Sequence, residues 1–451
     1  MTLASPPIAM ARFGLGTSAA GADIDGDVRA AFLGELDQPP LLPERRNAQL
    51  ETGATLYAMV RKVQSTRRDA KGGDDATYME AQQALQGAVR ADLQYRIAMA
   101  KAAPTGVVER LVAFWSNHFA IAAKSNALLR GMAGAYEREA IRPHVLGRFD
   151  DLLLAATQHP AMLTYLNNAV SVGPGSRLGV RRDKGLNENH ARELMELHTL
   201  GVDGGYEQAD VTSLAKVLTG WSIGAQGRDD ADIGTFQFRQ QTHEPGAQTV
   251  MGKAYDQGGI AQGEAVLADL AAAPATARHI ATKLARHFVA DEPDPALVSV
   301  LERAFLDSGG DLRIVTQTLL QSDLAWLPER RKLRSPQEFL WAALRALDLD
   351  LAPRKVNKML DDLGQGLWNP PSPAGYSDSV ATWLAPGGMT TRLEVAQVLA
   401  ADAGGPDDPR ELARLVFGDA VSDQTLLTIS RAESRIQGLS LMLMSPEFQR
   451  R

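Results

Sequence analysis

The spacing of apolar residues constrains this 451-residue chain more than any other feature. Over most of its length they recur every three or four positions, which is typical of amphipathic α-helices. Many of these segments begin at a capping residue or a proline and end at a glycine. The chain is therefore predicted to be mainly α, a large multi-helix domain with helices over residues 81–102, 107–120, 132–141, 149–158, 160–167, 188–200, 208–218, 260–271, 274–289, 296–308, 312–320, 336–347 and 392–401.

One stretch departs from helical spacing. Residues 235–243 alternate at first, Pro245-Gly246 suits a turn, and residues 248–252 look extended again. We expect a small β-hairpin there, inserted among the helices. The expected organisation is one domain over 1–451, in which 107–221 holds the core helices and the candidate site, 233–255 the hairpin and 260–451 a C-terminal helical part.

Composition excludes several classes of function. The 47 Lys and Arg residues are fewer than the 54 Asp and Glu residues, so an extended basic face for nucleic acid is not expected. Without cysteine there is no thiolate metal site and no cysteine nucleophile. No apolar run reaches about 18 residues, the length that a membrane-spanning helix needs. The N-terminus has no basic stretch ahead of an apolar one, so we expect no signal peptide and a cytoplasmic location.

The strongest candidate site begins at Asn187 and reads NENHARELMELHTLGVDGGY. Asn187 suits the start of a helix and Gly201 suits its end. Glu193 and Glu196 lie three positions apart, so both carboxylates share one side of the helix, as in the carboxylate-rich metal sites of helical bundles. His198 falls on the apolar stripe. We expect a polar cleft here, closed by the loop 171–184 and by the hairpin.

Two interpretations of this cleft stay open. In the first it holds a divalent metal ion, because imidazoles and carboxylates together suit Zn, Fe or Mn. A carboxylate would then take a proton from water, and an arginine would neutralise an anionic substrate. The predicted metal ligands are His118, Glu193, Glu196, His198 and His243, and the predicted catalytic residues are Glu193, Glu196, Arg192 and Arg142. In the second interpretation these groups are structural: Arg192 pairs with Glu196, and each histidine bonds a carbonyl in the core.

Several motifs resemble one large bacterial family, the domain of unknown function 1800. The segment from Asn187 carries the resemblance most specifically, and further motifs agree with it at 114–119 (FWSNHF), 141–147 (IRPHVLG), 159–166 (HPAMLTYL) and 445–450 (SPEFQR). The resemblance covers nearly the whole chain. Asn167 and Glu244 depart from it, because each stands where the family pattern has aspartate.

The resemblance implies a partner but no reaction. Members of the family commonly occur beside a second protein similar to sulfatases and alkaline phosphatases, often with a twin-arginine export signal. This implies a protein partner and, through it, export to the periplasm by co-transport. Two functions therefore stay open: a metal-assisted hydrolase, and a non-catalytic accessory or chaperone-like subunit of such a partner.

Overall fold

A computed structural model describes residues 4–18, 27–38, 50–70, 75–182, 185–224 and 232–451. Helices dominate this part of the chain, so the predicted mainly α fold is confirmed. The first helices are α1 (Pro6–Arg12), α2 (Val28–Asp37), α3 (Gly53–Ala70), α4 (Asp75–Ala102), α5 (Val107–His118), α6 (Ala127–Tyr136), α7 (Phe149–Gln158), α8 (Pro160–Tyr165), α9 (Gly179–Arg182), α10 (Asn189–Glu193) and α11 (Gln208–Leu218).

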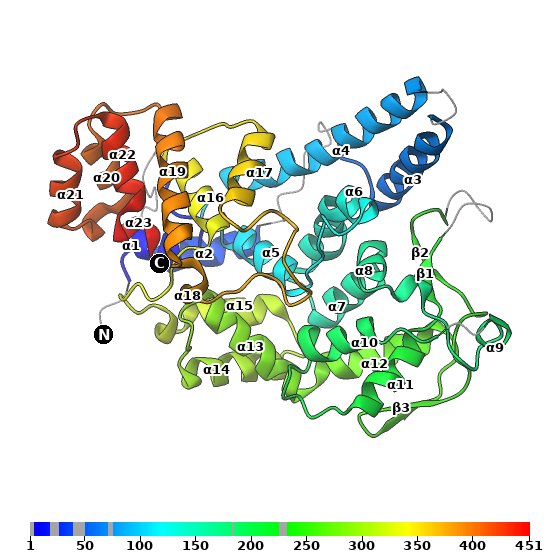
Figure 1. Cartoon of the computed structure of the whole chain (residues 1–451). Coiled ribbons are helices and arrows are strands. Elements are labelled where there is room, and N and C mark those ends of the chain that lie inside the picture. The colour runs from blue at the N-terminus through cyan, green and yellow to red at the C-terminus, as the bar shows by residue number, and fades with distance from the viewer. Residues whose placement is uncertain (1–3, 19–26, 39–49, 71–74, 183–184, 225–231) are drawn as a thin grey trace.

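The later helices follow the strands and run to the end of the chain. They are α12 (Ile260–Ala272), α13 (Pro274–Phe288), α14 (Pro295–Asp307), α15 (Leu312–Gln321), α16 (Pro336–Ala346), α17 (Pro353–Asp362), α18 (Val380–Trp383), α19 (Pro386–Asp402), α20 (Pro409–Phe417), α21 (Asp423–Ser430), α22 (Arg435–Met444) and α23 (Pro446–Gln449). In Figure 1, α3 and α4 form a hairpin that projects at one end of the molecule, and α20 to α22 form the opposite end. No helix in the described ranges is long and apolar enough to cross a membrane.

The strands form two short antiparallel pairs. β1 (Trp221–Ile223) pairs with β2 (Phe236–Phe238), and β3 (Gln248–Val250) pairs with β4 (Lys253–Tyr255). A small hairpin within 233–255 is therefore present, but its turn is Met251-Gly252, not the predicted Pro245-Gly246. Met251 and Gly252 both have positive φ (50° and 75°), which suits a two-residue hairpin turn. β2 pairs with β1 instead, and the Trp221 ring packs edge-on against Phe236 at 5.4 Å across this pair.

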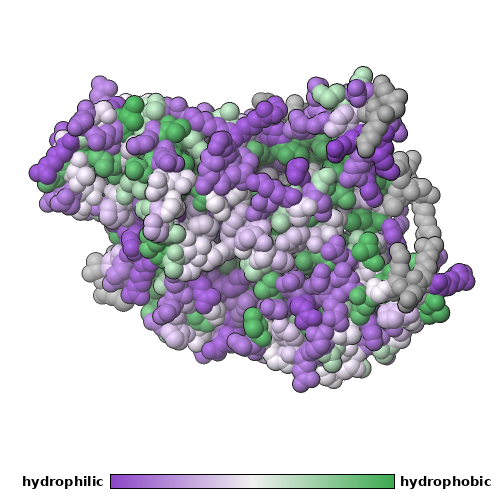
Figure 2. Space-filling view, viewed as in Figure 1, coloured by the Kyte–Doolittle hydropathy of each residue, from purple (hydrophilic) through white to green (hydrophobic). Residues whose placement is uncertain are grey.

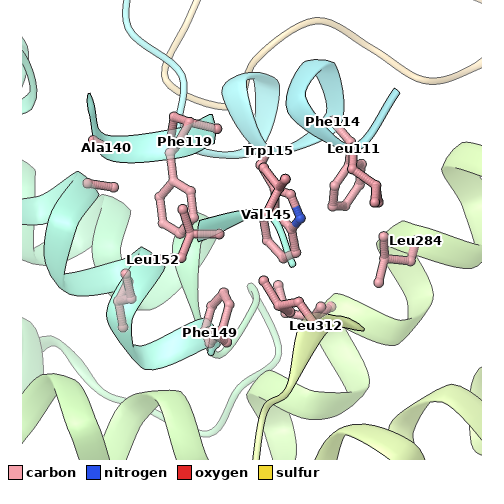
Figure 3. Close-up of a cluster of buried hydrophobic side chains, with 14 of the residues drawn as sticks. Leu111, Phe114, Trp115, Phe119, Ala140, Val145, Phe149, Leu152, Leu284 and Leu312 are labelled. Atoms are coloured by element: carbon pink, nitrogen blue, oxygen red, sulfur yellow. The ribbon is translucent and has the colours of Figure 1, made fainter. Parts of the chain in front are cut away.

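Two hydrophobic clusters fill the interior. The larger one surrounds α5, where Trp115 lies 5.8 Å from the ring of Phe149 and 6.1 Å from that of Phe119. Figure 3 shows side chains of α5, α7, α13 and α15 meeting around Trp115. The second cluster joins α16, α17, α19, α20 and α22. α4 connects the two, since Ala88 belongs to the first cluster and Ile97 to the second.

Buried arginines tie helix ends to distant segments. The guanidinium of Arg345 donates to the carbonyls of Ala100 (3.2 Å), Lys101 (3.1 Å) and Ala103 (2.6 Å), at the C-terminal end of α4. The Arg451 guanidinium likewise donates to the carbonyl of His287 (2.8 Å), at the C-terminal end of α13. The last carbonyls of a helix have no intrahelical donor, and the helix dipole favours a cation there. The two arginines thus satisfy acceptors that the helices leave unpaired.

We predict that Arg345→Met lowers the free energy of unfolding by about 3 kcal/mol, because several buried carbonyls lose their donor at once. Urea unfolding followed by circular dichroism measures this loss. Arg431→Met is the control, since the exposed Arg431 side chain makes no hydrogen bond or ion pair within the described residues. It should change the free energy by no more than about 0.5 kcal/mol. Equal effects of both substitutions would contradict the role of Arg345.

Candidate functional site

The segment predicted as one helix after Asn187 changes helix type halfway. α10 ends at Glu193, and Leu194–His198 forms a π-helical turn. A second π-helical turn, Glu137–Ile141, follows α6. Such turns are rare and frequently occur at functional sites. Both reach α5: the Ser116 hydroxyl donates to Glu137 (3.3 Å), and the His118 ring meets the carbonyl of His198 (3.1 Å).

Four histidines, His118, His190, His198 and His279, lie close to the π-helical turn Leu194–His198. The ring centroids of His118 and His198 lie 6.0 Å apart, and those of His118 and His279 lie 6.2 Å apart. His118 Nε2 and His279 Nε2 donate to the carbonyls of His198 and Leu197 (3.1 and 3.2 Å). These are the last carbonyls of the π turn. Two imidazoles thus act as its C-terminal cap.

Burial keeps this cluster neutral near pH 7. Both ring nitrogens of His190 and of His198, and His118 Nδ1, have no hydrogen-bond partner among the described residues. Desolvation lowers the pKa of His190 to about 3 and that of His279 to about 4. It also lowers the pKa of Lys283, on the facing helix α13, to about 8. The histidines are therefore uncharged, desolvated bases near pH 7, whereas Lys283 beside them still carries a charge.

The predicted metal ligands do not all converge. His118 and His198 lie close together, and Glu193 and Glu196 lie on the same segment as His198. His243 is separate: its Nδ1 bonds the carbonyl of Thr219 (2.8 Å), and its ring packs against Phe238. Within the described residues, no group of three or more His, Asp or Glu side chains is placed to hold a metal ion.

Glu193 and Glu196 are half-buried and make no hydrogen bond or ion pair with any described residue. Burial raises the pKa of Glu193, and the nearby charge of Glu196 raises it further. The structural interpretation supposed that Arg192 pairs with Glu196, and this pairing is wrong. The Arg192 guanidinium instead bonds Glu188 at 3.1 Å, one helical turn earlier. The two carboxylates thus lie near each other without an ion pair to any described residue, although the charge of Arg192 offsets part of the rise in the pKa of Glu193.

Arg142 lies in a buried charge network under α5. Its guanidinium binds both carboxylate oxygens of Glu109, at 2.5 and 3.0 Å, and approaches Glu137 at 3.6 Å. Arg96 contacts the same two glutamates, at 2.7 and 3.3 Å. Burial alone would raise the pKa of Glu109, but Arg142 and Arg96 hold it below its ordinary value. Both terminal nitrogens of Arg142 are thus directed at these glutamates.

The structure shows the surroundings of Asn167 and Glu244, the two residues that depart from the family pattern. Asn167 has a left-handed backbone (φ 58°) just after α8, a conformation that asparagine tolerates. The Glu244 carboxylate accepts the N–H of Gly175 (2.7 Å). The loop that begins at Ser171 therefore packs on the turn that carries His243, and Ser171 Oγ also accepts the N–H of Asn187 (3.0 Å). Residues 183–184 of that loop lie outside the described residues.

A polar cavity of about 60 Å³ was missed at the sequence level. His287 Nδ1 donates to Asp378 Oδ1 (2.9 Å), and Arg110 donates to His287 Nε2 (3.2 Å). Arg110 also forms an ion pair with Glu338 (2.9 Å). Ser116, Glu137 and Tyr376 also line the cavity. One signal was available in the sequence: His279, Lys283 and His287 recur every four residues along α13, which makes a basic stripe on one face of that helix.

A much larger hollow of about 490 Å³ lies between α3, α4, α6 and α17, and we call it the α4 groove. Figure 2 shows hydrophobic residues gathered where α4 crosses α6 in Figure 1, with hydrophilic residues around them. The groove residues are Val63, Gln64, Arg67, Tyr78, Gln82, Leu85, Gln86, Val89, Arg90, Leu93, Ala127, Arg130, Gly131 and Arg354. None of the sequence motifs singled out above contributes to it.

We predict that His190→Leu makes stability less sensitive to acid. Between pH about 6.5 and about 3, the unfolded chain binds a proton at His190 that the folded chain excludes, so stability falls as pH falls. The loss approaches about 1.4 kcal/mol per pH unit for each such histidine. Urea unfolding at about pH 8 and about pH 5 compares the two proteins. An unchanged difference between the two pH values would show that His190 titrates normally in the fold.

Comparison with known proteins places the chain without giving it an activity. No curated protein and no solved structure matches it. A family model described as "Protein of unknown function (DUF1800)" matches residues 8–450, which is nearly the whole chain. The chain therefore belongs to the DUF1800 family.

Proposed function

We propose that this chain is a non-catalytic accessory subunit that binds a protein partner. The α4 groove carries the proposal, because it combines a half-buried apolar floor with four exposed arginines. Among the described residues, none of these arginines forms a hydrogen bond or ion pair through its side chain. Exposed apolar hollows with polar edges are typical of surfaces that another molecule covers.

The contacts of the predicted catalytic residues support this function over the hydrolase. Arg142 is directed at Glu109 and Glu137, Arg192 at Glu188 and Gln208, and His118 at a backbone carbonyl. A catalytic group needs its reacting atom directed at a substrate. Internal partners occupy both terminal nitrogens of Arg142, one nitrogen of Arg192 and Nε2 of His118. Glu193 and Glu196 keep no partner among the described residues. Arg142, Arg192 and His118 are therefore proposed to hold the fold.

The partner proposed is the protein similar to sulfatases and alkaline phosphatases that the family resemblance implies. The chain would then be exported together with that partner, as the family resemblance implies. Its site of action would be the compartment to which the partner is exported.

Co-expression with the neighbouring phosphatase-like protein tests this function. We predict that the two chains co-elute in size-exclusion chromatography, and that the partner is soluble only when both are made. Glu193→Gln with Glu196→Gln should leave the complex intact, because these carboxylates lie outside the groove. Each variant is checked for folding by circular dichroism.

The opposite result would favour the metal-assisted hydrolase. The partner would be soluble alone, and the purified chain would carry near-stoichiometric metal that His198→Ala with Glu193→Gln removes. Elemental analysis of protein purified without an affinity-tag metal supplies that measurement.

The polar cavity favours a second candidate function, an acid–base enzyme for a small anionic substrate. Asp378 orients His287 as a carboxylate orients a general-base histidine, and Arg96 and Arg110 line the same cavity. In this function the substrate anion would replace His287 Nε2 as the acceptor of Arg110, which would free that nitrogen to act as the base. We predict for this function that inorganic phosphate raises the melting temperature of the wild type and not of Asp378→Asn. No shift in either protein would remove the support for it.

A further inference from the structure

We infer that the α4 groove binds an acidic amphipathic helix of about four turns, supplied by a protein partner. This inference rests on the proposed accessory function and adds the chemistry of the surface that the partner presents.

The spacing of the groove residues indicates a helical occupant. α4 contributes seven of them, Tyr78, Gln82, Leu85, Gln86, Val89, Arg90 and Leu93, which recur every three or four positions along one face. Val63 and Arg67 of α3 lie four positions apart on the facing helix. Two packed helices that leave such a seam open present the ridges against which a third helix packs.

The length of the seam sets the length of the occupant. From Tyr78 to Leu93 there are fifteen residue steps, which at a rise of about 1.5 Å per residue make about 22 Å. A helix of about 15 residues covers this distance in about four turns. Three apolar side chains along this seam are only half-buried, namely Leu85, Val89 and Leu93. A covering helix would therefore remove further apolar surface from water.

The charges of the groove indicate an acidic occupant. Arg67, Arg90, Arg130 and Arg354 are its charged residues, and no Asp or Glu of the described part lines it. Several exposed arginines elsewhere have a carboxylate partner, as in the pairs Arg148–Asp150, Arg410–Asp408 and Arg278–Glu302. The groove is thus a local positive surface on a chain whose net charge is −7. Complementary charge of this kind sets which partner docks.

The placement of the arginines favours an extended polyanion as the occupant over a single lipid headgroup. Arg67 is in the last turn of α3, beside the start of α4, whereas Arg90 follows Tyr78 by twelve positions, or about 18 Å along α4. One carboxylate or phosphate does not reach both ends. A helix with acidic residues on both flanks of an apolar stripe reaches all of them and also covers the floor.

Fluorescence anisotropy with a labelled synthetic peptide tests the inference on the full-length chain. The probe has 16 residues with leucines at helical spacing and glutamates on both flanks, and a second peptide replaces every glutamate with lysine. We expect the acidic peptide to bind and the lysine peptide not to bind. Arg90→Glu with Arg130→Glu should weaken the acidic peptide by at least about tenfold and allow the lysine peptide to bind.

The matched control is Arg303→Glu with Arg431→Glu. Both arginines are exposed, lie outside the groove, and have no side-chain partner among the described residues. This variant carries the same change in net charge, so it should bind the acidic peptide as the wild type does. Equal weakening in both variants would show that net charge, and not the groove, attracts the peptide.

Other results would overturn the inference and identify the true occupant. Equal binding of both peptides would show non-specific apolar adhesion, and no binding of either would exclude a helix. Displacement of the acidic peptide by oleate, at concentrations below its micelle formation, would assign the groove to a lipid. A dimer in sedimentation velocity that Arg90→Glu with Arg130→Glu dissociates would assign it to a second copy.

The same variant separates this inference from the proposed function. If the phosphatase-like partner still co-elutes with Arg90→Glu and Arg130→Glu, the chain is an accessory subunit that uses another surface. If that partner never binds but the acidic peptide does, the groove has the inferred chemistry and the accessory function fails.

Discussion

Helices end in carbonyl groups that their own N–H groups do not reach, and in this protein buried arginines supply many of the missing donors. Arg345 caps α4, Arg451 caps α13, and Arg12 reaches the carbonyls of Ala325 and Leu327 after α15. The same contacts hold the segments between the helices. Each planar guanidinium has several N–H donors in a fixed geometry, so it binds several carbonyls at once. The arrangement of the two hydrophobic clusters depends on these fixed points.

A polar layer accompanies these caps. Arg110 and Arg451 meet on Glu338 of α16, while Arg96 and Arg142 meet on Glu109 of α5. Burying charges in this way costs free energy, and the pairs offset that cost only while every member keeps its partner. The layer therefore fixes how α5 and α16 face each other, and the loss of one member leaves a charge unpaired in the interior.

Much of the fold follows from the sequence, and the reasons are local. The predicted bounds of α7 and α11 are confirmed, and at α11 the Glu207–Asp210 capping box marks the start. Regular periodicity cannot reveal the π turns, because each inserts one extra residue per turn and so changes which side chains share a face. Arg192 consequently pairs with Glu188 and not with Glu196. The strand partner of β2 was missed because it lies before the predicted hairpin, at Trp221–Ile223.

The candidate surfaces were harder to predict than the helices. The motifs that carry the family resemblance are rich in His, Glu and Arg. In the interior His118 contacts His198, and Arg142 binds Glu109. The arginines of the α4 groove come from α3, α4, α6 and α17, and no short motif links them. Only the fold brings them around one apolar floor. The polar cavity is similar, since Asp378 reaches His287 from a loop 91 residues away.

The central claim is that the polar motif supports the fold and that the α4 groove makes the contact with a partner. Hydrogen–deuterium exchange of the chain, alone and in its complex with the phosphatase-like protein, tests this claim most directly. The account predicts slower exchange in α4 and in the facing parts of α3 and α6, with residues 187–206 unchanged. Slower exchange confined to residues 187–206 and the Ser171 loop, with no change in α4, would contradict it.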